Sequence, residues 1–277
     1  MAFISEIENL KIIYKEIIEG YSLVDGVFIK HLDEIENIEV VAHKLSLYEK
    51  YIKDGISSVE DKLKFLIESG QWTLEKEDEI VSLSQQIIDN ESNLHNIISQ
   101  QQGRIKKVIE ALKIKKAQIL IDKQNLLGQT ANFFAERDSF NYLVYVSLYK
   151  DLKNRMFDSY TEFQELDDLE LIKYSQILEG VLEKITHQSI RQIACMPFFI
   201  NPFSYSKENI YYFLGKPLSR LTHYQSSLLS LGSRNLNTLA NIDVEPPELT
   251  EANKLDDITV WYDQQHSILL GKKRSGR

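Results

Sequence analysis

The side chains that most often do chemistry in proteins are few here and widely spaced. No two of the six histidines stand four residues apart, as two metal ligands on one helix face do, and the chain has no His-Glu-x-x-His motif. The sequence therefore predicts no metal site at any histidine, namely His31, His43, His95, His187, His223 and His266.

Two other groups of reactive side chains have a simpler structural explanation. The single cysteine, Cys195, lies among apolar residues, which favours a buried, inert thiol over a nucleophile. A single cysteine also excludes an internal disulfide and fits a reducing compartment. The carboxylates of Glu165, Asp167, Asp168 and Glu170 could bind a metal in principle. The N-terminus of a helix explains them better, because the helix dipole favours anions there.

One short stretch, Gly215-Lys216-Pro217, is similar to the end of a phosphate-binding loop. However, Ile210 stands where the first glycine of such a loop belongs, and Pro217 stands where Ser or Thr would bind magnesium. The sequence also contains no GxSxG, GxGxxG or paired-cysteine motif. We therefore expect no catalytic residue, no cofactor and no enzyme activity.

A basic run extends from Arg104 to Lys123, with seven bases and two acids. It could contact phosphates, but neither aromatic residues nor a groove-binding motif accompany it, so a solvated or ion-paired helix face is favoured. The net charge of −9 argues against a protein that coats DNA or RNA. Nucleic acid is therefore a second choice of partner.

The elements that must position these groups are organised around residues 74–127, the longest helical pattern in the chain. Its first part, Glu75 to Glu91, carries six acids and one base, opposite in sign to the basic run. We expect a helical hairpin that breaks near residues 96–99 and lays the acidic half along the basic half. Ser99 to Gln102 forms a capping box, as a restarting helix needs. The alternative is one helix about 80 Å long that pairs antiparallel with a second copy.

Proline placement predicts the overall architecture, because proline disrupts helix interiors. All five prolines lie in residues 197–247, and the first 196 residues have none. We expect an all-α fold: a multi-helix bundle with the long helical hairpin (or one very long helix) at its centre, an irregular aromatic loop and an extended C-terminal arm. The expected segments are residues 1–72 (N-terminal helical region), 73–195 (long-helix body), 196–242 (aromatic loop and helix) and 243–277 (acidic, proline-containing linker and arm).

Local signals add detail to this architecture. Asp25-Gly26 between short β-formers indicates either a β-hairpin or a turn between helices. Trp72 stands at the junction before the long stretch, where a tryptophan is usually a core residue. Helices are expected over residues 133–157 and 167–195, and Gly180 in the second marks a close helix crossing. Pro217 is expected to start a further helix.

Two segments have the character of binding surfaces. Residues 196–214 form an aromatic loop, whose aromatic side chains between Phe198 and Phe213 could supply interface hot spots or pack into the protein's own core. The C-terminal arm ends in a short helix and a basic tail, and could dock on a neighbouring molecule or on its own body. The candidate partner-binding residues are Phe198, Phe199, Phe203, Tyr211, Tyr212, Trp261, Tyr262, Lys272, Lys273 and Arg274.

The sequence gives no sign of a membrane segment or a targeting signal. Its longest apolar runs are far shorter than the ~20 residues that span a bilayer. The first residues turn acidic too soon for a signal peptide. We therefore expect a soluble, cytoplasmic protein that does not bind membranes.

Several stretches resemble a family of uncharacterised helical proteins carried by large tailed bacteriophages. The resemblance implies a virus-encoded structural or assembly protein, located in the host cytoplasm or the virion, and brings no functional residue with it. The stretches are Gly20-Tyr21-Ser22 with Phe28 to Leu32, Gly70 to Thr73, Pro197 to Asn201, Phe213 to Pro217 with Leu221 to Gln225, and Trp261-Tyr262.

These observations favour a non-enzymatic structural or assembly protein that acts through protein–protein interaction. Its partners are protein chains, including a second copy bound through the long helices. The alternative is an adaptor that regulates transcription or replication machinery through the basic run and the basic tail.

Overall fold

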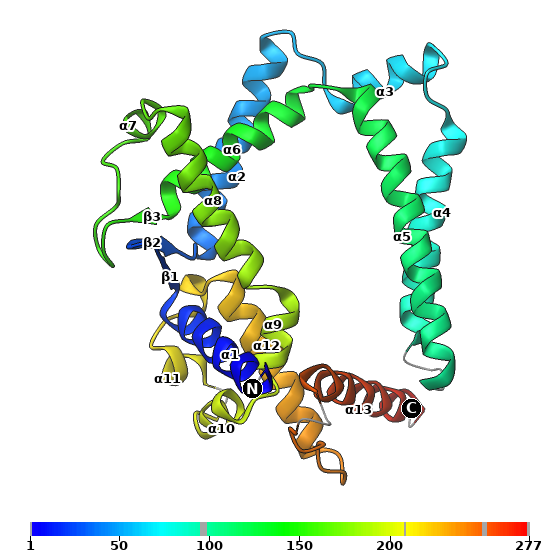
Figure 1. The fold of residues 1–277 in the computed structure, drawn as a ribbon, viewed down its shortest axis with the longest axis vertical. Coiled ribbons are helices and arrows are strands. Elements are labelled where there is room, and N and C mark those ends of the chain that lie inside the picture. Colours follow the sequence, from blue (N-terminus) through cyan, green and yellow to red (C-terminus); the bar gives the residue numbers. More distant parts are fainter. Residues whose placement is uncertain (1, 95–98, 208, 251–253, 276–277) are drawn as a thin grey trace. The chain divides into compact units, whose positions relative to one another are not determined.

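The computed structural model describes residues 2–94, 99–207, 209–250 and 254–275. These residues form thirteen α-helices, one short 3-10 helix and three short strands (Figure 1). The chain is therefore mostly helical, as the sequence predicts.

The chain divides into two compact units, which are described separately. Unit 1 contains residues Met1–Ala42 and Phe140–Arg277, and unit 2 contains His43–Ser139. The chain passes from one unit to the other within α2 (Glu34–Lys53) and within α6 (Ala131–Ser147). These divisions do not coincide with the segments expected from sequence, because unit 1 joins two stretches that are far apart in the chain.

Unit 1 contains a small antiparallel sheet of β1 (Tyr21–Val24), β2 (Val27–Lys30) and β3 (Leu148–Tyr149), in that order. The turn between β1 and β2 has Asp25 at φ 50° and Gly26 at φ 80°. Two consecutive residues with positive φ define the hairpin turn whose twist matches that of the strands, and Asp-Gly is a preferred sequence for it. The β-hairpin alternative for this stretch is confirmed.

The third strand corrects the helix expected over residues 133–157. α6 ends at Ser147, and Leu148–Tyr149 pairs with β2. After the strand, the Asp151 carboxylate accepts the backbone N–H groups of Lys153 and Asn154, which gives the backbone an alternative to helical hydrogen bonds. Residues that are apolar on all sides fit a buried strand as well as a buried helix, so periodicity alone could not separate the two.

The core of unit 1 lies among α1 (Ala2–Glu19), α8 (Asp168–Lys184), α9 (His187–Ile193) and α12 (His223–Ala240), beside the sheet. The short α7 (Tyr160–Gln164) packs at its edge through Phe163. The helix expected over residues 167–195 is broken into α8 and α9. Thr186 stands at the break and caps α9 by accepting the N–H of Ser189 at 3.0 Å.

The aromatic loop expected at residues 196–214 is helical instead. It forms α10 (Pro197–Tyr205) and α11 (Ile210–Leu214). Pro197 occupies the first turn of α10, where proline is tolerated, and Pro202 lies inside the helix. The helix expected to start at Pro217 begins later: Leu218–Arg220 is a 3-10 turn, and a capping box at Thr222 opens α12.

The close helix crossing lies at Gly232 and not at Gly180. Gly180 is exposed and has open space where a Cβ would stand. A Cβ on Gly232, in contrast, would lie 2.7 Å from the ring of Phe199 and 3.0 Å from that of Phe203. α12 can therefore approach α10 this closely only because residue 232 has no side chain.

Unit 2 contains α3 (Val59–Glu68), α4 (Leu74–Leu94) and α5 (Ser99–Leu127). α4 and α5 lie side by side (Figure 1), and their acids and lysines pair: Glu77 with Lys123 at 2.8 Å, Glu79 with Lys115 at 2.6 Å and Glu91 with Lys113 at 2.7 Å. The pairing order is antiparallel. The expected break at residues 96–98, and the side chains of the expected capping box up to residue 101, lie outside the described residues.

Trp72 is the centre of a second core, in unit 2. It is buried with Leu66 and Leu127, as expected for a tryptophan at this junction. Its indole N–H donates to Glu77 at 2.7 Å, and Lys76 lies 4.5 Å from the ring centre. Trp72 therefore ties the start of α4 to α3 and to the end of α5.

The C-terminal part is longer and more regular than expected. The acidic linker has no helix or strand in residues 243–250, but α13 (Leu255–Ser275) is a helix of 21 residues. Its inner face buries Leu255, Ile258, Tyr262 and Leu269.

Candidate functional site

The aromatic candidates for partner binding divide between core and surface. Phe199, Phe203 and Tyr262 are at most 3% exposed, so they are core residues of unit 1 and are not available to a partner. Phe198 and Trp261 are half-buried. Tyr211 and Tyr212 are exposed, at 64% and 79%. The side chains of the remaining candidates, Lys272, Lys273 and Arg274, lie outside the described residues.

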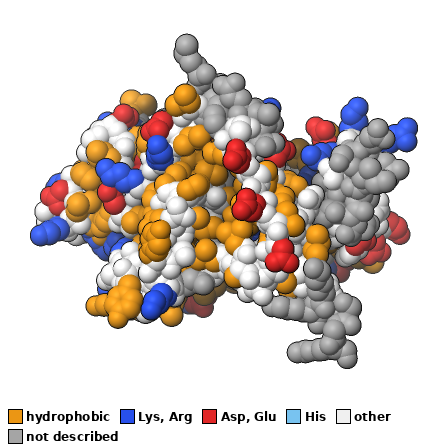
Figure 2. Space-filling view, turned by 90° about the horizontal axis from the view of Figure 1, so that it is seen from below, with side chains coloured by type: hydrophobic (Ala, Val, Ile, Leu, Met, Phe, Trp, Pro, Cys, Tyr) orange, Lys and Arg blue, Asp and Glu red, His pale blue; other side chains and the backbone are white. Residues whose placement is uncertain are grey.

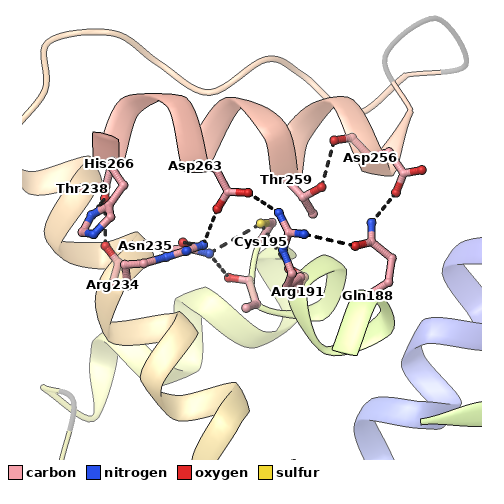
Figure 3. Close-up of polar contacts among 11 residues, drawn as sticks. Gln188, Arg191, Cys195, Arg234, Asn235, Thr238, Asp256, Thr259, Asp263 and His266 are labelled. Atoms are coloured by element: carbon pink, nitrogen blue, oxygen red, sulfur yellow. Dashed lines mark hydrogen bonds and ion pairs between the residues drawn. The ribbon is translucent and has the colours of Figure 1, made fainter. Parts of the chain in front are cut away.

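Charged side chains from three helices of unit 1 meet at Asp263, on α13 (Figure 3). Its carboxylate accepts from Arg191 on α9 and, at 2.9 Å, from Arg234 on α12. The Nε of Arg234 is buried and has no hydrogen-bond partner among the described residues. One carboxylate is thus shared by two guanidinium groups, and the three side chains together carry a net charge of +1.

Weaker contacts extend this network along α13. Near its start, Asp256 accepts from Gln188 at 2.6 Å and from Gln192 at 3.0 Å. Near its end, Thr238 and His266 lie 3.4 Å apart (Figure 3). Together with the buried apolar face of α13, this network holds the arm on the body of its own chain, which was one of the two alternatives left open by the sequence.

Cys195 lies inside this network and is buried, as predicted. Its Sγ donates to the carbonyl of Arg191 at 3.3 Å and lies 3.5 Å from the Nδ2 of Asn235. Burial raises the pKa of the thiol to about 12. Because the thiolate is the nucleophilic form, this cysteine has no reactive form near neutral pH.

A second polar chain lies beneath the β-hairpin. Lys184 pairs with Glu16 at 2.5 Å, Ser22 donates its hydroxyl to Glu16 at 2.8 Å, and Ser22 Oγ lies 3.0 Å from His31 Nε2. The residue types are those of a hydrolase triad, but the order differs: a triad places histidine between serine and acid, and here serine is in the middle. Ser22 is also fully buried. This arrangement does not activate the serine.

The same contacts determine which nitrogen of His31 carries the proton. A carboxylate can only accept, so the Ser22 hydroxyl proton points to Glu16 and Ser22 Oγ must accept from the N–H of Nε2. Nδ1 is then an acceptor, and it is buried without a partner in the described structure. Burial, together with the positive charges of Lys216 and Lys184, lowers the pKa of His31 to about 4, so the ring is neutral.

His31 forms part of the wall of a cavity of about 160 Å³ in unit 1. The other walls come from β2, α2, α6, α8 and the start of α12, and about half of the lining side chains are apolar. A buried side chain that has a polar atom without a partner among the described residues thus borders a cavity.

The contact between Ser22 and His31 could have been predicted from the sequence. The two-residue Asp-Gly turn fixes the strand register, which sets Ser22 opposite Ile29. His31 is two residues beyond Ile29 and therefore on the same face as Ser22. The ion pairs of Asp263 could not be predicted in this way, because Arg234 and Arg191 are 29 and 72 residues from Asp263 in the chain.

Two further searches bear on the sequence predictions. Among the described residues, no group of three or more His, Cys, Asp or Glu side chains could hold a metal ion. None of the described helices is long and apolar enough to cross a membrane.

Comparison with known proteins identified no relative. Neither a family model, nor a curated protein, nor a solved structure matches this chain. The function must therefore be inferred from the chain itself.

The lowered pKa of His31 predicts a loss of stability in mild acid. The folded-state pKa of about 4 is below the ordinary 6.5, so the unfolded chain binds the proton more tightly than the folded chain. The stability that depends on a neutral His31 is therefore fully present above pH 6.5 and is lost as the pH falls towards 4. Between about pH 7 and about pH 5, the free energy of unfolding should fall in the native chain. We expect this fall to be about 2 kcal/mol larger than the fall in His31→Gln. Urea denaturation at both pH values measures this difference.

His187→Gln serves as the control, because His187 is exposed. It should retain the pH dependence of the native chain. An equal pH dependence in His31→Gln and the native chain would contradict the assignment of a neutral, buried His31.

Proposed function

We propose that this chain is a non-enzymatic structural or assembly protein that binds other protein chains through the outer faces of α4 and α5. The observation that carries the proposal is a column of apolar residues on α4, Leu74, Val81 and Ile88, spaced seven residues apart and each more than half exposed. α5 adds Ile114 and Ile121 at the same spacing and with similar exposure. Residues seven apart differ in direction by only about 20° on a helix, so each column forms a strip suited to a partner helix.

These columns face away from the packed side of each helix. Val81 is two residues from the buried Leu83, and Ile121 is two residues from Ile119, which packs against the core around Trp72. Two residues correspond to about 200° of rotation, so the columns lie on roughly the opposite sides of α4 and α5. Exposed apolar side chains are also found elsewhere, as the face in Figure 2 illustrates. The seven-residue spacing recurs on α2 at Ile38, Leu45 and Ile52, and the columns on α4 and α5 differ from it in belonging to two helices that lie side by side.

The charges favour a second copy of the chain as the partner. Three acids of α4 take no part in the ion pairs with α5, namely Glu75, Asp78 and Asp89. α5 has bases outside those pairs, including Arg104, Lys106 and Lys107. An antiparallel second copy sets an acidic α4 against a basic α5 on each side of a twofold axis. In this proposal α4 and α5 act together as a helical hairpin, and the resemblance to phage proteins makes the assembly a virion or a virus-assembly intermediate.

The test is the oligomeric state in solution. We expect the native chain to form a dimer whose dissociation constant rises at least about tenfold in the double variant Val81→Lys/Ile88→Lys, because each lysine must lose its hydration in the interface. Analytical ultracentrifugation over a range of concentrations measures this.

The matched control is Leu169→Lys/Ile172→Lys, at exposed apolar positions on α8 of unit 1. It should dimerise like the native chain. A native chain that stays monomeric at about 100 μM, or a dimer that both double variants weaken equally, would reject this interface.

A nucleic-acid adaptor is the second candidate. Arg104, Lys106 and Lys107 are exposed on α5, and such bases can contact phosphates. Lys113, Lys115 and Lys123 of the same run already pair with acids of α4, which reduces the positive charge available. The adaptor requires salt-sensitive binding of DNA or RNA, or capture of a polymerase or helicase. Gel-shift titrations at low and high salt, and pull-down from the source cell, test for these.

A further inference from the structure

The cavity beside His31 has the properties of a small-molecule site. Apolar side chains from four elements line it: Ile29 from β2, Leu143 from α6, Leu178 and Val181 from α8, and Tyr224 from α12. The ring of Tyr224 meets the edge of His31 at a centroid distance of 5.2 Å. Ligand sites are commonly cavities that combine apolar walls with placed polar groups, and this one combines these apolar side chains with the polar side chains of Asn37, Ser147 and Thr222.

Polar side chains also line the cavity, among them Asn37, Ser147 and Thr222, and His31 is the lining residue with a buried acceptor that has no partner among the described residues. Ser22 takes the N–H of His31 Nε2, so Nδ1 presents a lone pair. His31 is 6% exposed, and Nδ1 has no hydrogen-bond partner within the described residues. A buried acceptor without a donor has lost the hydrogen bond that water gives it in the unfolded chain, and a ligand that donates to it restores that bond.

The size of the cavity limits the ligand. An apolar protein cavity of about 150 Å³ binds benzene, so about 160 Å³ accommodates one six-membered ring and little more. The electrostatics limit it further. A carboxylate has no proton to donate to Nδ1, and a cation would be repelled by Lys216 and Lys184, whose charges both act on His31.

We propose that this cavity binds a small neutral alcohol of phenol size, with the ring among the apolar side chains and the hydroxyl donating to His31 Nδ1. The site lies in unit 1 and is independent of the α4 and α5 surfaces on which the proposed function rests. It gives the protein a second property, the recognition of a small molecule.

The probes are phenol, toluene and benzoate, added to the full-length chain. We expect saturable binding of phenol, seen as a change in the ¹⁵N shift of His31 Nδ1 and as heat in calorimetry. Toluene should bind at least about tenfold more weakly than phenol, because it leaves Nδ1 unsatisfied, and benzoate should not bind.

Two variants locate the site. His31→Gln retains a donor for Ser22 and removes the ring acceptor. The affinity for phenol should therefore fall at least about tenfold, towards the affinity for toluene. The affinity for toluene should stay the same. Val181→Phe fills the cavity and should abolish binding of both phenol and toluene. Ile172→Phe, at an exposed position of the same helix, is the control and should bind like the native chain.

Equal affinities for phenol and toluene, binding that survives Val181→Phe, or no saturable binding would each overturn the proposal. If Val181→Phe does not fold, as circular dichroism would show, the phenol-to-toluene ratio of His31→Gln against the native chain decides the question. A ratio that stays the same in both proteins rejects the His31 hydrogen bond.

Discussion

Replacing Trp72 by Ala should unfold unit 2 and leave unit 1 folded. The indole is 1% exposed and fills the core of unit 2 together with Leu66 and Leu127. Removing a buried tryptophan costs about 4 kcal/mol, from lost burial and from the cavity that remains. The variant also leaves Glu77 without its indole donor. Domains are stable by only about 5–15 kcal/mol, and unit 2 has a small core, so a loss of this size should be decisive.

The chain is well suited to this measurement because its second tryptophan, Trp261, lies in unit 1. In Trp72→Ala, fluorescence reports on unit 1 alone and should show an unchanged unfolding transition. Hydrogen exchange should show lost protection in α3, α4 and α5. Trp72→Phe retains a ring but loses the N–H, so its protection in unit 2 should lie between that of the native chain and that of Trp72→Ala.

Phe65→Ala is the control for the Trp72 variants, because Phe65 lies in unit 2 but is 56% exposed. It should change stability by less than about 1 kcal/mol. A Trp72→Ala protein in which both units lose protection together would show that the two units do not fold independently.

The parts of the fold that the sequence predicted correctly are those with local causes. Asp25-Gly26 determines its turn through two positive φ values, and Asp167 starts its helix by accepting the N–H of Glu170, three residues ahead. These interactions span only a few residues, so residue type and spacing are sufficient to predict them.

The errors have non-local causes. Residues 196–214 contain two prolines and were expected to be a loop, but Phe199 and Phe203 stack 5.3 Å apart beneath Gly232, and this packing stabilises α10 despite Pro202. Gly180 and Gly232 are equivalent in the sequence, and only the fold decides which one lies at a helix crossing. The division into units was equally hidden, since residues 1–42 meet residues 140–277 only after folding.

The candidate sites follow the same division. The Ser22–His31 pair follows from a short hairpin and its register, so it was accessible from sequence. The cavity beside it was not, because its walls come from five elements of unit 1 that are far apart in the chain. The exposed columns on α4 and α5 are partly visible in the sequence as apolar residues at helical spacing. Which of those residues face inward depends on how the two helices pack.

Replacing Asp263 by Ala should detach α13 from the body of unit 1. The Asp263 carboxylate is shared by Arg191 and Arg234, and its side chain is 16% exposed. Without it, two partly buried guanidinium groups face each other unpaired. Breaking a buried ion pair on one side costs about 3–5 kcal/mol, so we expect about 4 kcal/mol here. Hydrogen exchange of α13 measures the loss, which should be larger there than in α1 or α8.

Two further variants distinguish whether the ion pairs or the apolar face hold α13 on unit 1. Asp257→Ala removes an exposed carboxylate of the same helix, which accepts from the Lys254 N–H within the described residues. This variant should change exchange in α13 little beyond its first turn. The triple variant Arg191→Met/Arg234→Met/Asp263→Leu removes all three charges and should recover most of the lost stability, because no unpaired charge remains buried. If the triple variant is as unstable as Asp263→Ala, the ion pairs themselves hold α13. If it recovers, the apolar face with Leu255, Ile258 and Tyr262 holds the helix, and the charges determine where it docks.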